Sequence, residues 1–533
     1  MTTTHAAAIS SWTKLLGAAQ VLSTAAAQQA YGLDTTASSR KLVAALKPSA
    51  SEQIPEIVRI AKANRTSIYP ISTGNNWGYG TSLPAANDCV LLDLSGLSQI
   101  KEFDAELGVI TVEPGVTQGM LAKFLDEGGH DFMVPVTGGG PNCSLLGNAL
   151  ERGYGVTPHT DHFGAVTHIE AVLADGSIYR SGLHEAGGIE VAKLFKWGIG
   201  PYINGLFTQS GFGVVTQMTI LLARRPQCSK VCFFSIPDDQ MLEEAVRRVQ
   251  RILQTLPGIV GGSNLMNRHR MLAMAAPYPA TQIGPNGLIP EEVIAAMGRE
   301  YQIFPWTGFM TLYGSKKVVA AAQKEIRNIL KGFAKRLVFL SNGQAQGLAK
   351  LAKLIPGRLG QRAGSTAQTL AKSLELVGGR PNETAMPLAY WRNPNPPKGP
   401  SRDPGRDGSG LIWYAPLVPM RPQAARSFVD MVKAITHRHG IEPLITLTSI
   451  SDKVFDSTIP ILFDRQKESE TANAKACNQE LLDSGALQGF LPYRVGISSM
   501  PWLAERMGSA GKLNRQLRQS LDPDNIISPG RYS

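Results

Sequence analysis

An apolar segment that runs into a glycine-rich loop constrains this chain most. Residues 67–71 (SIYPI) have the composition of a strand, and the loop STGNNWGYG follows them at 72–80. Such a loop offers backbone N–H groups and small side chains at close range, as a pyrophosphate requires. It lacks the spacing of a Rossmann fingerprint and the lysine of a P-loop. The sequence therefore predicts either a dinucleotide site outside a Rossmann unit or an ordinary glycine-rich turn.

Size and charge narrow the class of protein. The chain has 533 residues, which exceeds one ordinary hydrophobic core and predicts two or more domains. Its net charge is +11, spread without a run of five Lys or Arg, so we expect anionic cofactors or partners and no nucleic acid.

The cysteines and apolar runs indicate a cytoplasmic protein. The cysteines are scattered without a C-x-x-C pair, which disfavours disulfides and a metal site, so no metal is expected. They are Cys89, Cys143, Cys228, Cys232 and Cys477. No apolar run is long enough to span a bilayer, and no membrane partner is expected. The Ala-rich segment 6–29 lacks the positive start of a secretory leader and predicts an amphipathic helix instead.

Apolar periodicity predicts an α+β organisation for the first 230 residues. Helices are expected at 52–64 and 118–127. Strands are expected at 67–71, 89–94, 109–112, 168–173, 178–180 and 213–222. These elements do not alternate as regular βαβ units.

The remainder of the chain changes character twice. Strands alternate with helices at 240–254, 290–298 and 316–331, whereas 342–410 is rich in Gly, Pro, Lys and Arg and holds few periodic elements. Within it, the proline-rich segment 392–408 is expected to be a loop. Strands are then predicted at 411–417 and 442–449, flanking a helix at 422–438, before a turn-rich tail at 521–532.

Several separated motifs carry a family resemblance. They are GNALERG at 147–153, TPHTDH at 157–162, FTQSGFGVVT at 207–216 and DPDNIISPGR at 522–531. Together with the first loop, and in this order, they resemble the flavoproteins of the vanillyl-alcohol oxidase and p-cresol methylhydroxylase group. The resemblance runs with gaps from about residue 10 to the C-terminus and is weakest at 333–410.

The resemblance implies an architecture and a cofactor. We expect an FAD-binding domain at 1–230, a substrate-binding cap domain at 231–490, and a C-terminal segment at 491–533 that returns to the FAD domain. The cofactor-binding residues that the motifs imply are Ile71, Ser72, Thr73, Gly74, Asn75, Asn76, Gly78, Gly138, Gly139, Cys143, Gly147, Asn148, Arg152, Gly153, Asp161, Gly213, Val214 and Arg531.

The same resemblance implies a chemistry for three residues. Tyr79 matches the family's loop tyrosine, and Tyr493 with Arg494 matches its Tyr-Arg pair, a set that binds a phenol as phenolate. A permanently charged guanidinium favours the ionised form. The expected reaction is hydride transfer from the benzylic carbon of a para-substituted phenol to flavin N5, giving a quinone methide. Hydroxylation, desaturation and oxidative decarboxylation remain open as outcomes.

The flavin attachment departs from the family pattern. Leu411 occupies the position of a linking His or Tyr and cannot form that bond. Cys143 stands four residues before Gly147, as the linking cysteine does in the berberine-bridge group. We expect FAD to bind without a covalent link, and a cysteinyl bond at Cys143 is the alternative; an inert buried thiol is the commonest fate of a free cysteine.

Two further departures bear on the substrate. The segment PVTGGGPN at 135–142 carries no carboxylate where relatives of the vanillyl-alcohol oxidase type have an acid near N5. His159 replaces the usual tyrosine, and packing is the preferred interpretation over proton transfer. Tyr390 and Trp413 are candidates for an aromatic substrate pocket, with plain core packing as the alternative.

The partners implied are a small aromatic substrate and either dioxygen or a protein electron acceptor. Dimers are common in the resembling family, so a homodimer is compatible with the sequence. Two alternatives to phenol oxidation remain open: a flavin oxidase of a non-phenolic alcohol, hydroxy acid or lactone, and a non-catalytic protein with the flavin fold.

Overall fold

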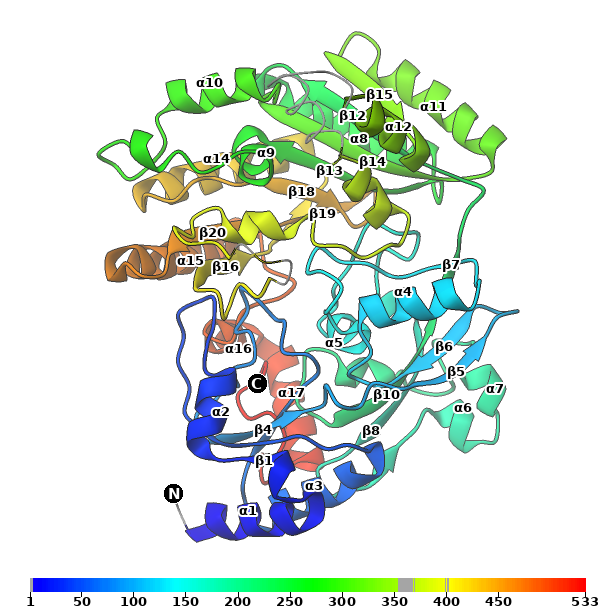
Figure 1. The fold of residues 1–533 in the computed structure, drawn as a ribbon, viewed down its shortest axis with the longest axis vertical. Coiled ribbons are helices and arrows are strands. Elements are labelled where there is room, and N and C mark those ends of the chain that lie inside the picture. Colours follow the sequence, from blue (N-terminus) through cyan, green and yellow to red (C-terminus); the bar gives the residue numbers. More distant parts are fainter. Residues whose placement is uncertain (1–2, 353–367, 369, 398, 400–401) are drawn as a thin grey trace.

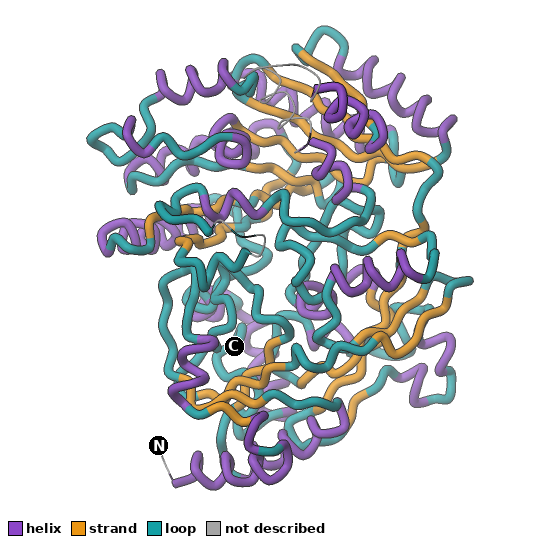
Figure 2. Tube along the Cα trace, in the orientation of Figure 1, coloured by secondary structure: helices purple, strands orange, loops and turns teal. Residues whose placement is uncertain are grey.

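The strands of the computed structural model gather in two groups with loop segments between them (Figure 2). The model describes residues 3–352, 368, 370–397, 399 and 402–533. We call the lower group in Figure 1, built mainly from residues before 225, the N-terminal lobe, and the upper group the cap lobe. Helices and strands are mixed in both, which confirms the α+β class.

The N-terminal lobe contains two main sheets. In the four-stranded sheet, order β1-β2-β4-β3, β2 and β3 pair in parallel with β4 and β1 pairs antiparallel with β2. The five-stranded sheet, order β5-β6-β10-β8-β9, is antiparallel. These strands are β1 (Val21–Leu22), β2 (Leu42–Leu46), β3 (Ile68–Ile71), β4 (Cys89–Asp93), β5 (Ile100–Asp104), β6 (Val109–Val112), β8 (Val166–Val172), β9 (Ile178–Tyr179) and β10 (Val214–Leu221).

Helices of the N-terminal lobe follow local signals. In α3 (Ile54–Ala63) the buried residues Ile54, Ile57, Val58 and Ala61 recur at helical spacing. The Thr117 side chain caps α4 (Gln118–Glu127) by accepting from the backbone N–H of Met120. The other elements are α1 (Thr3–Leu16), α2 (Thr24–Tyr31), β7 (Phe132–Met133), α5 (Leu145–Leu150), α6 (Gly182–Glu185), α7 (Ile189–Ala192) and β11 (Ala223–Arg224).

The cap lobe is built on a seven-stranded antiparallel sheet, order β15-β12-β14-β13-β18-β19-β17, and on the separate pair β16-β20. The strands are β12 (Cys228–Ile236), β13 (Val260–Asn267), β14 (Trp306–Gly314), β15 (Arg336–Leu340), β16 (Ser409–Tyr414), β17 (Leu417–Pro419), β18 (Thr446–Ser449), β19 (Val454–Ser457) and β20 (Ile459–Asp464). The helices are α8 (Leu242–Thr255), α9 (Arg268–Ala275), α10 (Glu291–Glu300), α11 (Lys316–Leu330), α12 (Asn342–Ala352), α14 (Pro422–Arg438) and α15 (Glu468–Leu487).

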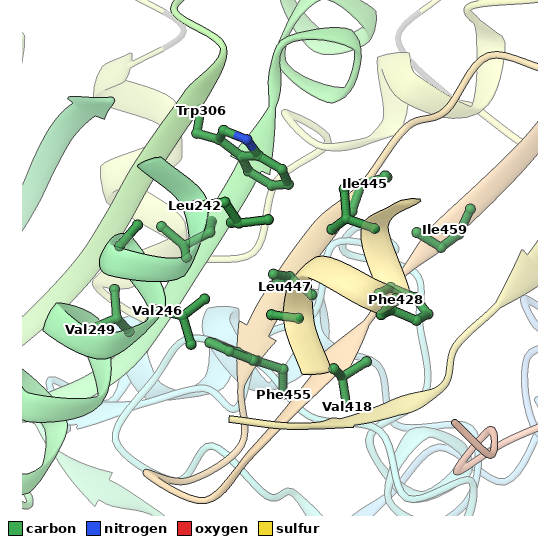
Figure 3. Packing of buried hydrophobic residues seen from close by; sticks show 14 of the residues in the cluster. Leu242, Val246, Val249, Trp306, Val418, Phe428, Ile445, Leu447, Phe455 and Ile459 are labelled. Carbon is green, nitrogen blue, oxygen red and sulfur yellow. The ribbon is translucent and has the colours of Figure 1, made fainter. Parts of the chain in front are cut away.

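The core of the cap lobe lies between this sheet and its helices. Figure 3 shows Leu242, Val246 and Val249 of α8 pointing toward strand residues such as Leu447 and Phe455. Phe428 of α14 joins the same cluster. Each of these side chains is fully buried, and burying one contributes roughly 1.5–3 kcal/mol to folding. The cap sheet is thereby a rigid support for any residue that it carries.

The end of the chain returns to the N-terminal lobe. After α16 (Met500–Arg506) and α17 (Gly508–Leu521), the backbone N–H of Ile68 donates to the carbonyl of Ile526, and that of Ser528 donates to Ile68. Ile526 and Ile527 are buried in the same cluster as Ile68. The last residues thus extend the four-stranded sheet beside β3, which explains how a turn-rich segment stays ordered.

Most predicted elements are confirmed within one to three residues, including the helices at 118–127 and 422–438. The single helix at 6–29 is wrong. It breaks at Gly17, whose φ of +85° is unfavourable for other residues, and Val21–Leu22 pairs with β2 instead. The strand at 411–417 is interrupted at Ala415–Pro416, and the strand at 442–449 begins only at Thr446.

The described part of 342–410 contains helices that periodicity did not reveal: α12, a helix over 370–377, and a short 3-10 helix at Met386–Tyr390. Part of this prediction, residues 353–367, lies outside the described residues. The described part of 392–408 is loop, as predicted. The domain boundaries at 230 and 490 stay predictions.

The Arg518 side chain generates a stability prediction for the returning tail. It is 11% exposed, its Nη1 donates to the carbonyl of Gly211 at 2.9 Å, and Nη2 donates to that of Ile527. Arg518→Met leaves both carbonyls without this donor, so we expect the free energy of unfolding in urea to fall by about 3 kcal/mol. Arg515→Met, on the exposed side of α17, is the matched control and should stay within about 0.5 kcal/mol. Equal effects from both variants would contradict this anchoring.

Candidate active site

A cavity of about 310 Å³ lies where the motifs identified in the sequence meet. Its walls come from the first glycine loop, the segment 137–151, the FTQS segment and the end of the chain. Four chain segments that are far apart in sequence therefore enclose one space in the N-terminal lobe.

Glycines keep the walls of this cavity close together. Gly74 has φ +70°, and an added Cβ would lie 2.3 Å from Ser82 Oγ. A Cβ on Gly147 would lie 3.0 Å from Ser72 Oγ, and one on Gly213 would lie 2.9 Å from the Phe207 ring. Small residues and backbone amides at these points fit the approach of a pyrophosphate group, as the first loop predicted.

The structure brings most of the predicted cofactor residues to this cavity. Those in its lining are Ile71, Ser72, Thr73, Gly74, Asn75, Asn76, Gly139, Cys143, Gly147, Asn148, Gly213 and Arg531. Tyr79 and Arg494 line the same space.

The other predicted cofactor residues are not part of the cavity lining. Arg152 donates from Nε and Nη2 to Thr208 Oγ1, and Asp161 Oδ1 accepts from the backbone N–H of Gly164. The backbone N–H of Gly78 donates to Thr35 Oγ1, and Val214 pairs with Val172 in the five-stranded sheet. A Cβ added to Gly138 would face Ala385, and a Cβ added to Gly153 would overlap Asn148. None of these six predicted residues lines the cavity.

Arg494 stacks on Tyr79 at the cavity wall. The guanidinium carbon lies 4.2 Å from the centroid of the Tyr79 ring, within the range of a cation–π contact. Its Nη2 also donates to Asn76 Oδ1, so the first loop and the C-terminal segment meet here. The stacking holds a permanent positive charge beside a tyrosine hydroxyl.

Tyr493 is packed next to this pair but does not line the cavity. Its backbone N–H donates to the carbonyl of Ala415, its carbonyl accepts from Gln209 Nε2 at 3.1 Å, and its ring lies 5.6 Å from that of Tyr154. Burial and then the Tyr493 hydroxyl raise the pKa of Tyr79 well above its usual value. Burial is the main cause that raises the pKa of Tyr493. Both hydroxyls stay protonated at neutral pH and keep a proton to donate.

Glu151 bridges two arginines that come from the end of the chain. One carboxylate oxygen lies 3.1 Å from Arg494 Nε, and the other contacts Arg531 Nη2. Arg531 Nη1 donates to the Tyr69 hydroxyl at 2.7 Å. All three charged side chains are 12–14% exposed. Glu151 stands inside the GNALERG motif, so a signal for it existed, but we did not predict it as a site residue.

Asp456 is a second acidic residue that sequence reasoning missed. It lies on β19, is fully buried, and neither carboxyl oxygen has a hydrogen-bond partner. Burial raises its pKa well above the usual value, so the group is neutral. No motif surrounds it, and only the pairing of β19 with β17 brings it near the segment that carries Tyr493.

Cys143 lies in the cavity lining as a protonated thiol. Its Sγ donates to the carbonyl of Gly139 at 3.0 Å. Burial raises its pKa to about 12. Because the thiolate is the nucleophile, this environment disfavours a bond to a flavin ring.

The three candidate substrate-pocket residues do not line the cavity. Burial lowers the pKa of the half-buried His159, which keeps it neutral. Tyr390 donates to Asp407 Oδ2 at 2.7 Å and is buried. Trp413 packs on the first loop, because its backbone N–H donates to the carbonyl of Gly78 and a Cβ on Gly78 would lie 2.2 Å from its ring.

The described residues also bear on metal binding and on membrane insertion. Within that part of the chain, no group of three His, Cys, Asp or Glu side chains is arranged to hold a metal ion. No described helix is long and apolar enough to span a membrane.

Comparison with known proteins gives matches over a part and over the whole of the chain. A family model described as an FAD binding domain matches residues 43–182. The chain is 32% identical over 529 residues to the 1'-carboxy-chondrochloren decarboxylase of Chondromyces crocatus, covering 98% of this chain and 96% of that protein. It is 28% identical over 492 residues to the 4-cresol dehydrogenase (hydroxylating) flavoprotein subunit of Pseudomonas putida, covering 92% and 87%. A solved structure of p-cresol methylhydroxylase with substrate bound superposes with a TM-score of 0.87 at 26% identity, covering 100% of this chain and 97% of that one.

The protonated state of Cys143 predicts how flavin leaves the protein. Acid precipitation of the purified protein should release FAD into the supernatant, as measured by its visible spectrum. Cys143→Ser should carry the same amount of releasable FAD, and Cys477→Ser, buried in α15 of the cap lobe, is the matched control. A yellow pellet that becomes colourless in Cys143→Ser would instead establish a cysteinyl bond.

Proposed function

Because the chain belongs to the p-cresol methylhydroxylase and vanillyl-alcohol oxidase family of FAD-dependent oxidoreductases, we propose that it oxidises a para-substituted phenol at the benzylic carbon. The observation that carries the proposal is the stacking of Arg494 on Tyr79 in the wall of the cavity that the cofactor motifs enclose. Tyr493 stands beside this pair as a second hydroxyl donor. The phenolate is the ligand that these three groups suit.

Electrostatics explain why ionisation of the phenol matters. A neutral phenol is a poor hydride donor, whereas a phenolate pushes charge through the ring to the para carbon. A permanent guanidinium charge favours the ionised ring oxygen, and hydrogen bonds to a charged oxygen are the strong ones. Because the pKa values of Tyr79 and Tyr493 are raised by burial, both donate without competing for the negative charge.

The net charge around Arg494 sets how strongly the phenolate is favoured. Glu151 neutralises part of the charge of Arg494 and Arg531, and Asp456, with its raised pKa, adds none. One arginine charge therefore remains unbalanced among these four groups until an anion binds. With Arg531 assigned to the anionic FAD, a phenolate is the anion proposed for Arg494.

Bound FAD supplies the hydride acceptor, and residues of the two glycine stretches with Arg531 would hold it. The substrate loses its phenolic proton and a benzylic hydride, which leaves a neutral quinone methide. In the segment 135–142 no carboxylate stands ready to assist addition of water. This supports desaturation or loss of carbon dioxide over assisted hydroxylation, and the name of the Chondromyces crocatus relative describes a decarboxylase.

Other features remain part of the proposal. We infer an FAD domain at 1–230, a cap at 231–490 and a closing segment at 491–533. The first boundary is supported by β12, which begins the cap sheet at Cys228, and the second by the helices α16 and α17 that follow the cap strands. The reduced cofactor passes its electrons to dioxygen or to a protein acceptor, and the protein acts in the cytoplasm.

Turnover by substituted variants tests the phenolate mechanism. Tyr79→Phe should lower kcat/KM for 4-ethylphenol by about 100-fold, because one donor to the ring oxygen is lost. Arg494→Lys should have a similar effect, since a lysine does not reproduce the planar stack on Tyr79. The matched control is Tyr179→Phe, which removes a hydroxyl that donates to Asn204 in the five-stranded sheet, away from the cavity. If neither site variant changes turnover of the best substrate, while a non-phenolic alcohol is oxidised well, the mechanism is wrong.

A chromophoric phenol tests ionisation without turnover. In buffer acidic enough to keep free 4-nitrophenol neutral, the bound ligand should show the yellow phenolate absorption. Arg494→Met should abolish this absorption, because the charge that favours the anion is gone. Arg251→Met, exposed on α8, is the control and should keep it. Because FAD is itself yellow, the phenolate absorption is read as a difference from the ligand-free protein, and its absence in the wild type would contradict phenolate binding.

A further inference from the structure

Arg270 on α9 is a largely buried cation that forms no ion pair with any residue that the structure describes. Its Nε and Nη1 atoms are inaccessible to solvent and have no hydrogen-bond partner. Among the described residues, no carboxylate forms an ion pair with it. Other inward-facing arginines of this chain are paired, as Arg494 and Arg531 are with Glu151 and Arg426 is with Asp239 and Glu243.

The position of Arg270 connects it to the proposed site. Its guanidinium carbon lies 5.6 Å from the centroid of the Trp413 ring. Trp413 in turn packs against Gly78, the residue directly before Tyr79. One indole ring therefore separates the Arg270 charge from the loop that carries the phenol-binding tyrosine.

An unpaired buried charge is costly to keep. Transfer of an isolated guanidinium from water into a protein interior costs several kcal/mol unless an anion accompanies it. Burial lowers the pKa of Arg270 to about 9, so the side chain is still charged at neutral pH. The aromatic cluster next to Arg270 includes Trp77, Trp391 and Trp413. An apolar residue in place of Arg270 would pack in this cluster without the cost of burying a charge. A ligand that supplies the missing anion accounts for the arginine.

We propose that Arg270 binds a carboxylate on the substrate, which makes the substrate a para-substituted phenol whose side chain carries a carboxylic acid. The proposal rests on the phenol-oxidising function above and places the two ends of one ligand: phenolate at Arg494, carboxylate at Arg270. A carboxylate carries one negative charge and balances one guanidinium. The second charge of a phosphate monoester would stay uncompensated at this site.

Two ligands that differ in this group test the inference. The probes are 4-ethylphenol and 3-(4-hydroxyphenyl)propanoate, and their dissociation constants are measured by calorimetry with the FAD-loaded protein. We expect the acid to bind the wild type at least about tenfold more tightly, the range of a hydrogen bond to a charged group. It should also raise the Tm of the wild type more than 4-ethylphenol does at equal concentration, because it pairs a charge that is otherwise unpaired.

Variants assign the preference to one side chain. In Arg270→Met the ratio of the two dissociation constants should fall toward one, and the ligand-free protein should gain Tm, because an unpaired charge is removed. Arg299→Met, exposed on α10, should retain the wild-type ratio. If Arg270→Met weakens both ligands equally, or lowers the ligand-free Tm, then Arg270 is structural and the inference is wrong. If Arg270→Met does not fold, the wild-type ratio decides: a ratio near one overturns the inference.

The two proposals fail in different ways. Oxidation of 4-ethylphenol without a preference for the acid would overturn the Arg270 inference and leave phenol oxidation standing. Failure to bind or oxidise either phenol would overturn phenol oxidation itself.

Discussion

The ion pairs of Glu151 are the interaction on which the rest of the site depends. One carboxylate joins Arg494 and Arg531, which lie 37 positions apart in the C-terminal segment, to the end of α5 in the N-terminal lobe. Because all three groups are largely withdrawn from water, loss of one partner would leave the others uncompensated. The pairing thus fixes both the chain terminus and the guanidinium that we propose binds the phenol.

Charge compensation also distinguishes the ionisable groups that are paired within the site from those that are not. Glu151 is shared between two cations, burial favours the neutral form of Asp456, and Arg270 forms no ion pair within the described part of the chain. The protein therefore presents positive charge at two places that its own residues do not neutralise. A substrate with two negative groups would complete both, which neither a simple cresol nor a neutral alcohol does.

Local signals in the sequence predicted the elements and the cofactor motifs well. Helical periodicity located α4 and α14, and the glycine stretches around Gly74 and Gly147 do line one cavity. What the sequence did not predict depends on contacts between distant segments. Asp456 and Arg270 sit in a strand and a helix without any motif, and only folding of the cap shows that each lacks a partner. The break at Gly17 was missed because alanine-rich composition favours a continuous helix.

The contact between Gly78 and Trp413 restricts how such proteins can be recombined. Any side chain at position 78 would overlap the indole ring, so the loop and strand β16 fit only as a matched pair. A chimera that joins this N-terminal lobe to the cap lobe of a homologue must therefore keep both Gly78 and the matching indole ring. Otherwise the graft would push the first glycine loop away from strand β16.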